Sequence, residues 1–299
     1  MSARAAASGE IWGEDFQRRL EALALASRRV VSGRTRAERR SRKTGSGVEF
    51  ADHREYAPGD DFRFLDWKLY GRSDRLLLRL FEEEEDLSVY VLLDTSASMG
   101  FGSPTKIRYG QRLAAALAYV ALASLDRVSV LTFSDVIGAR LPESRGKNRI
   151  FKVLAFLGAA RADGRTGLEA AMKTFVAQHK RRGIVIVLSD LYDPSGFERG
   201  IDILRYARFE PFVIQLVDPT EARPALHGEV RLIDRETGEA RDVTVTPRVL
   251  ERYAAAHAAH LAHIASYCAG KQVPQVAIET STPWDEAVLG VLRRGGLLG

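Results

Sequence analysis

The 299-residue sequence contains one cysteine, Cys268, and no apolar stretch long enough to cross a bilayer. A single cysteine excludes an internal disulfide and a cysteine-rich metal cluster, and it is typical of a protein in a reducing compartment. The first residues also lack the apolar core of a signal peptide, so we expect a cytoplasmic protein without a membrane span. Because Cys268 falls in a helical pattern, we expect it to be a buried structural thiol.

Charge of one sign is not in strong excess, since 44 Lys and Arg residues stand against 39 Asp and Glu residues, a net charge of +5. The distribution of charge is therefore more informative than its sum. Stretch 28–43 carries eight basic residues against the single acidic residue Glu38. No aromatic residue interleaves them for base stacking, which favours a solvated or partner-facing linker over a nucleic-acid arm.

One apolar run in the sequence ends in a polar loop. Residues 87–93 are apolar and rich in β-branched types, and Asp94-Thr95-Ser96-Ala97-Ser98-Met99-Gly100 follows directly. This pattern predicts a buried parallel strand, and ligands of open α/β sheets bind at the carboxyl ends of such strands. Asp94, Ser96 and Ser98 alternate, so that one carboxylate and two hydroxyls can converge. An all-oxygen cluster suits a hard divalent cation such as Mg²⁺ or Mn²⁺.

The spacing Asp-x-Ser-x-Ser after a hydrophobic strand resembles the metal-ion-dependent adhesion site of von Willebrand factor A domains. That resemblance implies a threonine on a second loop and an aspartate that ends another central strand. Thr166 lies just before a helical pattern, and Asp190 ends the apolar run 183–189. The implied metal ligands are Asp94, Ser96, Ser98, Thr166 and Asp190, with an outward position left for an acidic residue of a partner. In the alternative interpretation, the two aspartates merely cap the helices that follow their strands.

A second resemblance rests on a longer segment. The sequence GVEFADHREYAPGDDFRFLDW, residues 47–67, precedes RLFEEEEDLSVYVLLDTSASM, residues 79–99. Together they resemble the bacterial domain-of-unknown-function family 58, over about residues 45–280 of this chain. Members of that family without membrane spans look like chaperone-like adaptors that work with MoxR-type AAA+ ATPases. The resemblance therefore implies such an ATPase and an unknown client protein as partners.

Strands and helices alternate along the rest of the chain, which predicts a Rossmann-like α/β domain of the von Willebrand factor A type. We expect a central, mostly parallel sheet with helices on both faces, and a β-hairpin near 228–246 that projects from or extends one edge. We expect residues 82–299 to form this domain. Residues 1–81 are expected to form an N-terminal helix, a basic linker and a family-specific segment packed on the core. Predicted helices cover 11–31, 106–125, 150–157, 168–178 and 247–269, with one more from about 283; further strands cover 76–81, 127–133, 209–217 and 274–279.

Three further features of the sequence also allow predictions. In the family-specific segment, Trp67 is expected to be buried within a salt-bridged network of Arg54, Asp60, Asp61, Arg63, Asp66 and Arg72. The acidic run 82–86 is typical of a solvated turn. The histidines His257, His260 and His263 follow one another at intervals of three residues on one predicted helix, so all three cannot easily face one zinc ion. We therefore expect ordinary surface or edge-of-core histidines.

The residue chemistry favours binding over catalysis. Asp94 and Asp190 together would neutralise a divalent ion, and none of the three loops carries a histidine that could act as general base. We therefore expect a non-enzymatic, metal-dependent protein-interaction adaptor in protein complex assembly or remodelling. The alternatives are a metal-dependent hydrolase, because a bound ion can activate water, and a nucleic-acid-binding protein that uses stretch 28–43.

Overall fold

The computed structural model describes residues 12, 14–31, 40–43, 49–84 and 88–295. They fall into two compact units, of which the main unit comprises residues 1–30 and 87–298 and the second comprises residues 31–86. The second unit is thus inserted into the main one. This division differs from the predicted boundary at residue 81, because the N-terminal helix groups with the main unit.

The main unit is built on a six-stranded sheet with strand order β11-β8-β7-β4-β5-β6. Every neighbouring pair is parallel except β5 and β6, which are antiparallel. This confirms the predicted α/β fold with a mostly parallel sheet. Central strands β4 and β7 are buried along their whole length, as their continuous apolar sequences require. The strands are β4 (Ser88–Asp94), β5 (Arg127–Phe133), β6 (Ile137–Ser144), β7 (Ile184–Ser189), β8 (Glu210–Val217) and β11 (Gln275–Glu279).

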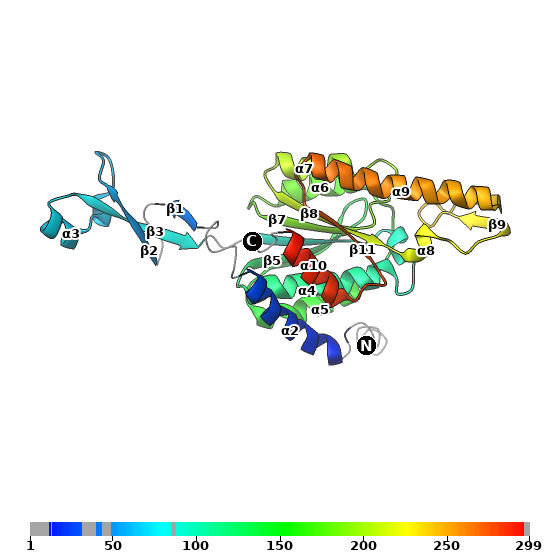
Figure 1. The fold of residues 1–299 in the computed structure, drawn as a ribbon, viewed down its shortest axis with the longest axis horizontal. Coiled ribbons are helices and arrows are strands. Elements are labelled where there is room, and N and C mark those ends of the chain that lie inside the picture. The colour runs from blue at the N-terminus through cyan, green and yellow to red at the C-terminus, as the bar shows by residue number, and fades with distance from the viewer. Residues whose placement is uncertain (1–11, 13, 32–39, 44–48, 85–87, 296–299) are drawn as a thin grey trace. The chain divides into compact units, whose positions relative to one another are not determined.

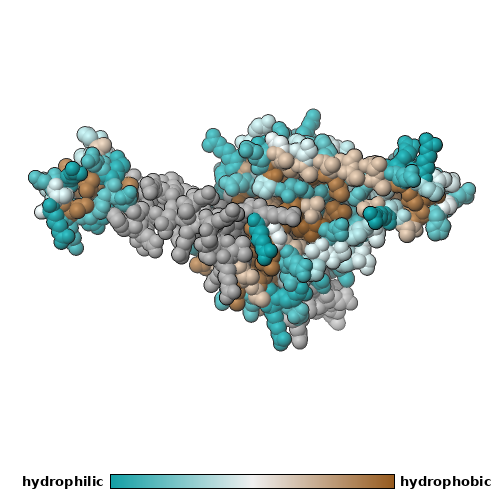
Figure 2. All heavy atoms as spheres, in the orientation of Figure 1, coloured by the Kyte–Doolittle hydropathy of each residue, from teal (hydrophilic) through white to brown (hydrophobic). Residues whose placement is uncertain are grey.

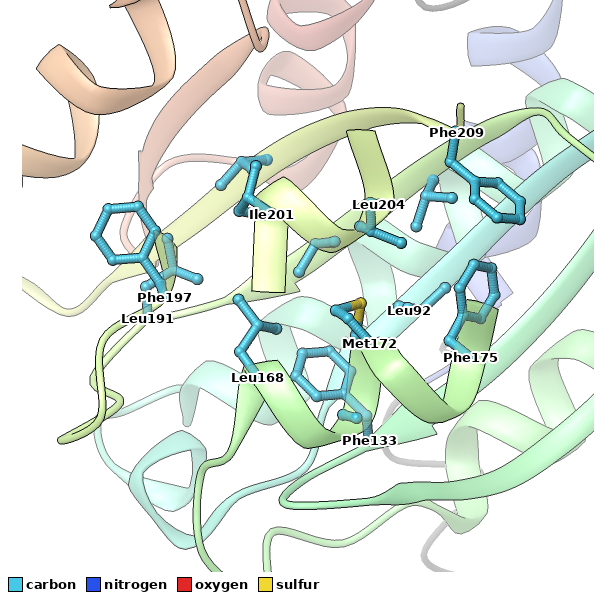
Figure 3. Packing of buried hydrophobic residues seen from close by; sticks show 14 of the residues in the cluster. Leu92, Phe133, Leu168, Met172, Phe175, Leu191, Phe197, Ile201, Leu204 and Phe209 are labelled. Atoms are coloured by element: carbon cyan, nitrogen blue, oxygen red, sulfur yellow. The ribbon is translucent and has the colours of Figure 1, made fainter. Parts of the chain in front are cut away.

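Helices cover both faces of this sheet (Figure 1). On one face, α6 (Leu168–Gln178), α7 (Glu198–Tyr206) and α9 (Pro247–Gly270) contribute to one buried apolar cluster with the sheet, part of which Figure 3 shows. The other face carries α4 (Lys106–Ala123), α5 (Ile150–Ala159) and α10 (Trp284–Gly295). Helix α4 packs closely there, since a Cβ on Gly110 would lie 2.9 Å from Leu93 Cδ1.

Helix α2 (Glu14–Val31) packs against α10. Its apolar side chains Phe16 and Leu20 are buried, and the Phe16 ring centroid lies 4.6 Å from that of Trp284. Arg19 Nε donates to Asp285 Oδ2 over 3.1 Å, and this hydrogen bond is the main reason that the pKa of Asp285 falls below its ordinary value. The amphipathic helix predicted from the sequence therefore has α10 as its partner surface.

The second unit contains a three-stranded antiparallel sheet with order β1-β3-β2, formed by β1 (Arg40–Lys43), β2 (Glu49–Glu55) and β3 (Leu77–Glu84). In the β1–β3 register, Arg40 stands opposite Glu84 and Arg42 opposite Glu82. The prediction of a solvated turn over the acidic run is therefore wrong as far as Glu84, because these residues extend a strand beside basic ones. Residues 85 and 86 of that run and residues 32–39 of the basic stretch lie outside the described residues.

Trp67 is 60% exposed, and the prediction that it is buried is wrong. It begins the short helix α3 (Trp67–Ser73), where its ring meets Tyr70 edge to face at 6.3 Å. A small sheet with one short helix can bury few side chains, and among the side chains described in this unit Leu65 and Leu78 are the buried apolar ones.

The charged residues around α3 form separate pairs instead of one network. Arg54 Nη2 lies 2.8 Å from Asp60 Oδ1, and Arg63 Nη2 lies 2.6 Å from Asp61 Oδ2. Asp66 caps α3 through the backbone N–H groups of residues 68 and 69. The hydrogen bond from His53, with further donors, lowers the pKa of Asp66 to about 2.

The hairpin strands β9 (Gly228–Ile233) and β10 (Ala240–Val245) pair with each other in a two-stranded sheet of their own. The hairpin therefore does not extend the main sheet. Figure 2 shows hydrophilic and hydrophobic residues mixed at the end of the main unit where β9 lies. None of the helices in the described part of the chain is long and apolar enough to cross a membrane.

Candidate functional site

The loops after β4 and β7 meet at the carboxyl edge of the sheet because these two strands are parallel neighbours. Asp94, the last residue of β4, is fully buried, and its Oδ1 accepts a hydrogen bond from Ser96 N over 2.8 Å. Its Oδ2 accepts from the Ser189 hydroxyl at the end of β7. In the same loop, Ser96 Oγ and Ser98 Oγ lie 3.0 Å apart. The structure therefore holds the Asp94 carboxylate in a fixed orientation beside two hydroxyls.

Asp94 has an unusual electrostatic environment. Burial, followed by the charge of Asp190, raises the pKa of Asp94 to about 7. Asp190, the residue after β7, is also buried. Two buried carboxylates at one strand edge repel each other, so this edge favours a cation.

Thr166 lies on a second loop that is tied to the first. Asp163 N donates to Thr95 O over 2.7 Å, and Ala97 N donates to Gly164 O over 2.9 Å. Thr166 itself is 8% exposed. Its hydroxyl donates to Glu236 Oε1 over 2.7 Å, and its backbone N donates to Glu236 Oε2 over 3.2 Å. The structure thus brings all three predicted loops to one edge and adds a carboxylate from the hairpin.

Lys106 is a site residue that the sequence analysis missed. It is the first residue of α4, its side chain is completely buried, and its Nζ lies 2.7 Å from Asp190 Oδ2. The same ammonium group donates to Glu221 on the short helix α8 (Pro219–Ala222). Burial alone would lower the pKa of Lys106, but the two carboxylates outweigh it and the pKa is raised. A lysine in the first turn of a helix opposes the helix dipole, and that mismatch was a signal for a nearby carboxylate.

The oxygen atoms at this edge are of the type that a hard divalent cation prefers. Metal–oxygen distances of about 2.1 Å place neighbouring ligands of an octahedral ion about 3.0 Å apart, which matches the two serine hydroxyls. Within the described residues, no group of three or more His, Cys, Asp or Glu side chains could hold a metal, so such an ion would depend on hydroxyl ligands. Lys106 pairs with the carboxylates of Asp190 and Glu221, and the carboxylates of Asp94 and Glu236 lie at the same edge.

The histidines of α9 contact different partners. His263 Nε2 lies 2.7 Å from Glu198 Oε1, whereas His260 stacks on Tyr192 with 5.3 Å between ring centroids. His257 stacks on Tyr253 at 6.3 Å. Cys268 on the same helix is buried, as expected, and burial raises the pKa of its thiol to about 11.

An open, mostly parallel sheet with polar side chains at the carboxyl ends of its strands is typical of α/β domains, and ligands of such domains bind at that edge. Within this class, the chain belongs to the family described as "Protein of unknown function DUF58", whose model matches residues 52–263. This confirms the family that the sequence resembles.

Several relatives and solved structures are similar to this chain. An uncharacterized protein of Mycobacterium tuberculosis is 27% identical over 299 residues, which cover 97% of this chain and 94% of that protein. One of Mycobacterium avium is 27% identical over 166 residues, 54% of this chain and 98% of its own. The conserved hypothetical protein BatB from Bacteroides thetaiotaomicron aligns with a TM-score of 0.45 and 14% identity, over 71% of this chain and 98% of that one. An aerotolerance-related membrane protein from Bacteroides fragilis also gives 0.45 and 14%, over 70% and 98%.

Proposed function

We propose that this protein is a non-enzymatic adaptor that binds an acidic residue of a partner through Mg²⁺ or Mn²⁺ at the carboxyl edge of its sheet. The observation that carries the proposal is the buried Asp94 carboxylate, oriented by Ser96 and Ser189 beside two hydroxyls 3.0 Å apart. The proposed ligands are Asp94, Ser96, Ser98, Thr166 and Asp190.

The roles of these side chains follow from their charges. Asp94 and Asp190 would balance the charge of the ion, whereas the hydroxyls would contribute oxygen donors without charge. When bound, the cation supplies a positive centre to which an external carboxylate can bind. Lys106 is a positioning residue, because its ammonium group fixes the Asp190 carboxylate from the buried side.

The resemblance of the family-specific segment and the strand that follows it supports a MoxR-type AAA+ ATPase as partner. An unknown client protein and a cytoplasmic location belong to the same proposal. The ATPase would be expected to remodel complexes that the adaptor recognises. This part of the proposal rests on family resemblance, whereas the metal site rests on the geometry of the strand edge.

The test measures association of the purified chain with a purified MoxR-type ATPase of the same organism, in Mg²⁺ and in EDTA at matched ionic strength. We expect association that needs Mg²⁺ and that Ser98→Ala weakens at least about tenfold, a loss of about 1.4 kcal/mol. The control is Ser195→Ala, an exposed serine on the loop after β7 that is no proposed ligand. Equal affinity in EDTA would contradict the metal site, and no association in either buffer would contradict the ATPase.

A further inference from the structure

We propose that Glu236 is an internal acidic ligand of the strand edge, which the β9–β10 hairpin holds in place until an external acidic residue displaces it. This inference rests on the proposed function, because it names how the same site is regulated. Its starting point is the carboxylate of Glu236, whose two oxygens accept from the N–H and the hydroxyl of Thr166.

Glu236 is the residue of the hairpin turn that enters the site. It is partly buried, whereas its neighbours Asp234, Arg235 and Thr237 are exposed. The contact spans 70 residues of sequence and joins the hairpin to a loop of the main sheet. A carboxylate on Thr166 is the same chemical group that the proposed function assigns to the partner, so the two would compete for one place.

A second contact places the hairpin turn over the first loop of the site. A Cβ on Gly100 would lie 3.1 Å from Arg235 Nη1, so this guanidinium group lies directly against the loop that carries Ser96 and Ser98. The turn is also preorganised, because Asp234 Oδ1 accepts from Glu236 N over 2.7 Å. The hairpin therefore meets two of the three loops of the site through adjacent side chains.

The rest of the hairpin gives the turn little support. Its strands form a separate two-stranded sheet, and nearly all of their residues are exposed or only partly buried. A two-stranded hairpin is marginally stable by itself in water. The contacts of Glu236 and Arg235 thus attach this turn to the loops of the main sheet, and we expect that losing them would release it.

The effect on the affinity for an external carboxylate can be estimated from the fraction of molecules in which the hairpin covers the site. The apparent affinity of an external carboxylate falls in proportion to the fraction of molecules whose site is uncovered. If the hairpin covers the site about nine-tenths of the time, an external acidic group binds about tenfold more weakly than it would to an uncovered site. A partner that also contacts other surfaces can overcome this factor, whereas a stray carboxylate cannot.

The experiment compares the wild-type chain with Glu236→Gln and Glu236→Ala, and uses Glu239→Gln as the matched control in the same turn. Hydrogen exchange of residues 234–238 and 163–167 reports whether the hairpin is docked. Mn²⁺ titration, followed by electron paramagnetic resonance, reports the ion. A blocked peptide with a single glutamate, titrated with and without Mn²⁺, reports the open ligand position. Substitutions of Glu236 should speed exchange in both segments at least about threefold and tighten Mn²⁺-dependent peptide binding about tenfold.

Each result separates the inference from the proposed function. If Mn²⁺ binds but the peptide affinity is equal in wild type and both Glu236 variants, the internal ligand is refuted and the metal site stands. Equal hydrogen exchange in all four proteins refutes the docked hairpin. If none of them binds Mn²⁺, the proposed metal site is refuted, and the exchange data alone then decide whether Glu236 holds the hairpin on Thr166.

Discussion

Replacing Lys106 with methionine should destabilise the main unit severely, because Lys106 is the buried cation between Asp190 and Glu221. Its side chain is completely buried, and methionine fills a similar volume without the charge. The substitution thus leaves two carboxylates without their cation at little cost in packing. Breaking a buried ion pair from one side costs about 3–5 kcal/mol, and we expect a loss in that range at neutral pH.

Urea unfolding followed by tryptophan fluorescence, to which the buried Trp284 contributes, measures this loss. Lys173→Met is the matched control, since Lys173 is 64% exposed in its ion pair with Glu169, and it should cost less than about 0.5 kcal/mol. The double variant Lys106→Met/Glu221→Gln should lose less than Lys106→Met alone, because one of the two carboxylates is then neutral. A loss for Lys106→Met no larger than for Lys173→Met would refute the reasoning.

Three further predictions concern other parts of the main unit. Mg²⁺ or Mn²⁺ should raise the Tm of the wild-type protein but not of Asp94→Asn in thermal melts at matched ionic strength, and an equal rise in both would place the ion elsewhere. Gly183→Ala should lower the free energy of unfolding in urea by about 1–3 kcal/mol, because the added Cβ would lie 2.0 Å from Ser88 O. The control Gly270→Ala has open space around its Cβ and should cost nothing. Equal effects of the two substitutions would contradict this packing. Arg19→Met should lower the free energy of unfolding by about 0.5–1 kcal/mol at neutral pH. Because Arg19 lowers the pKa of Asp285, this difference in stability between wild type and variant should vanish as the pH falls through that lowered pKa. A constant difference across the acid range would argue against the ion pair.

The central elements could be predicted from the sequence because their signals are local. Strands β4 and β7 are continuous apolar runs, and α6 matches its predicted range of 168–178. Edge strand β6 could not be found in this way, since its residues are mostly exposed and it contains Gly138 and Pro142. The prediction that Trp67 is buried failed because burial depends on how many helices and sheets surround a residue. Paired charges nearby in the sequence do not reveal that number.

The residues of the site also divide into those that a local sequence pattern predicts and those that it does not. Asp94, Ser96 and Ser98 lie within one short loop, so their convergence follows from spacing alone. The contacts of Lys106 with Glu221 and of Thr166 with Glu236 join residues separated by 115 and 70 positions. No local pattern encodes such pairs, because they form only when the loops and the hairpin are placed by the tertiary fold.

Because the second unit is inserted into the main unit, the two units can be separated by deleting one continuous segment of the gene. The chain leaves the main unit after α2 and re-enters it just before β4, so both junctions flank intact core elements. Beyond those junctions, β1 and β3 run antiparallel with Arg40 opposite Glu84, which keeps the outgoing and returning strands adjacent. Residues 32–86 could accordingly be excised and bridged by a glycine-serine linker, or exchanged for a fluorescent module. Such chimeras would assign each recognition event to either the sheet edge or the insert.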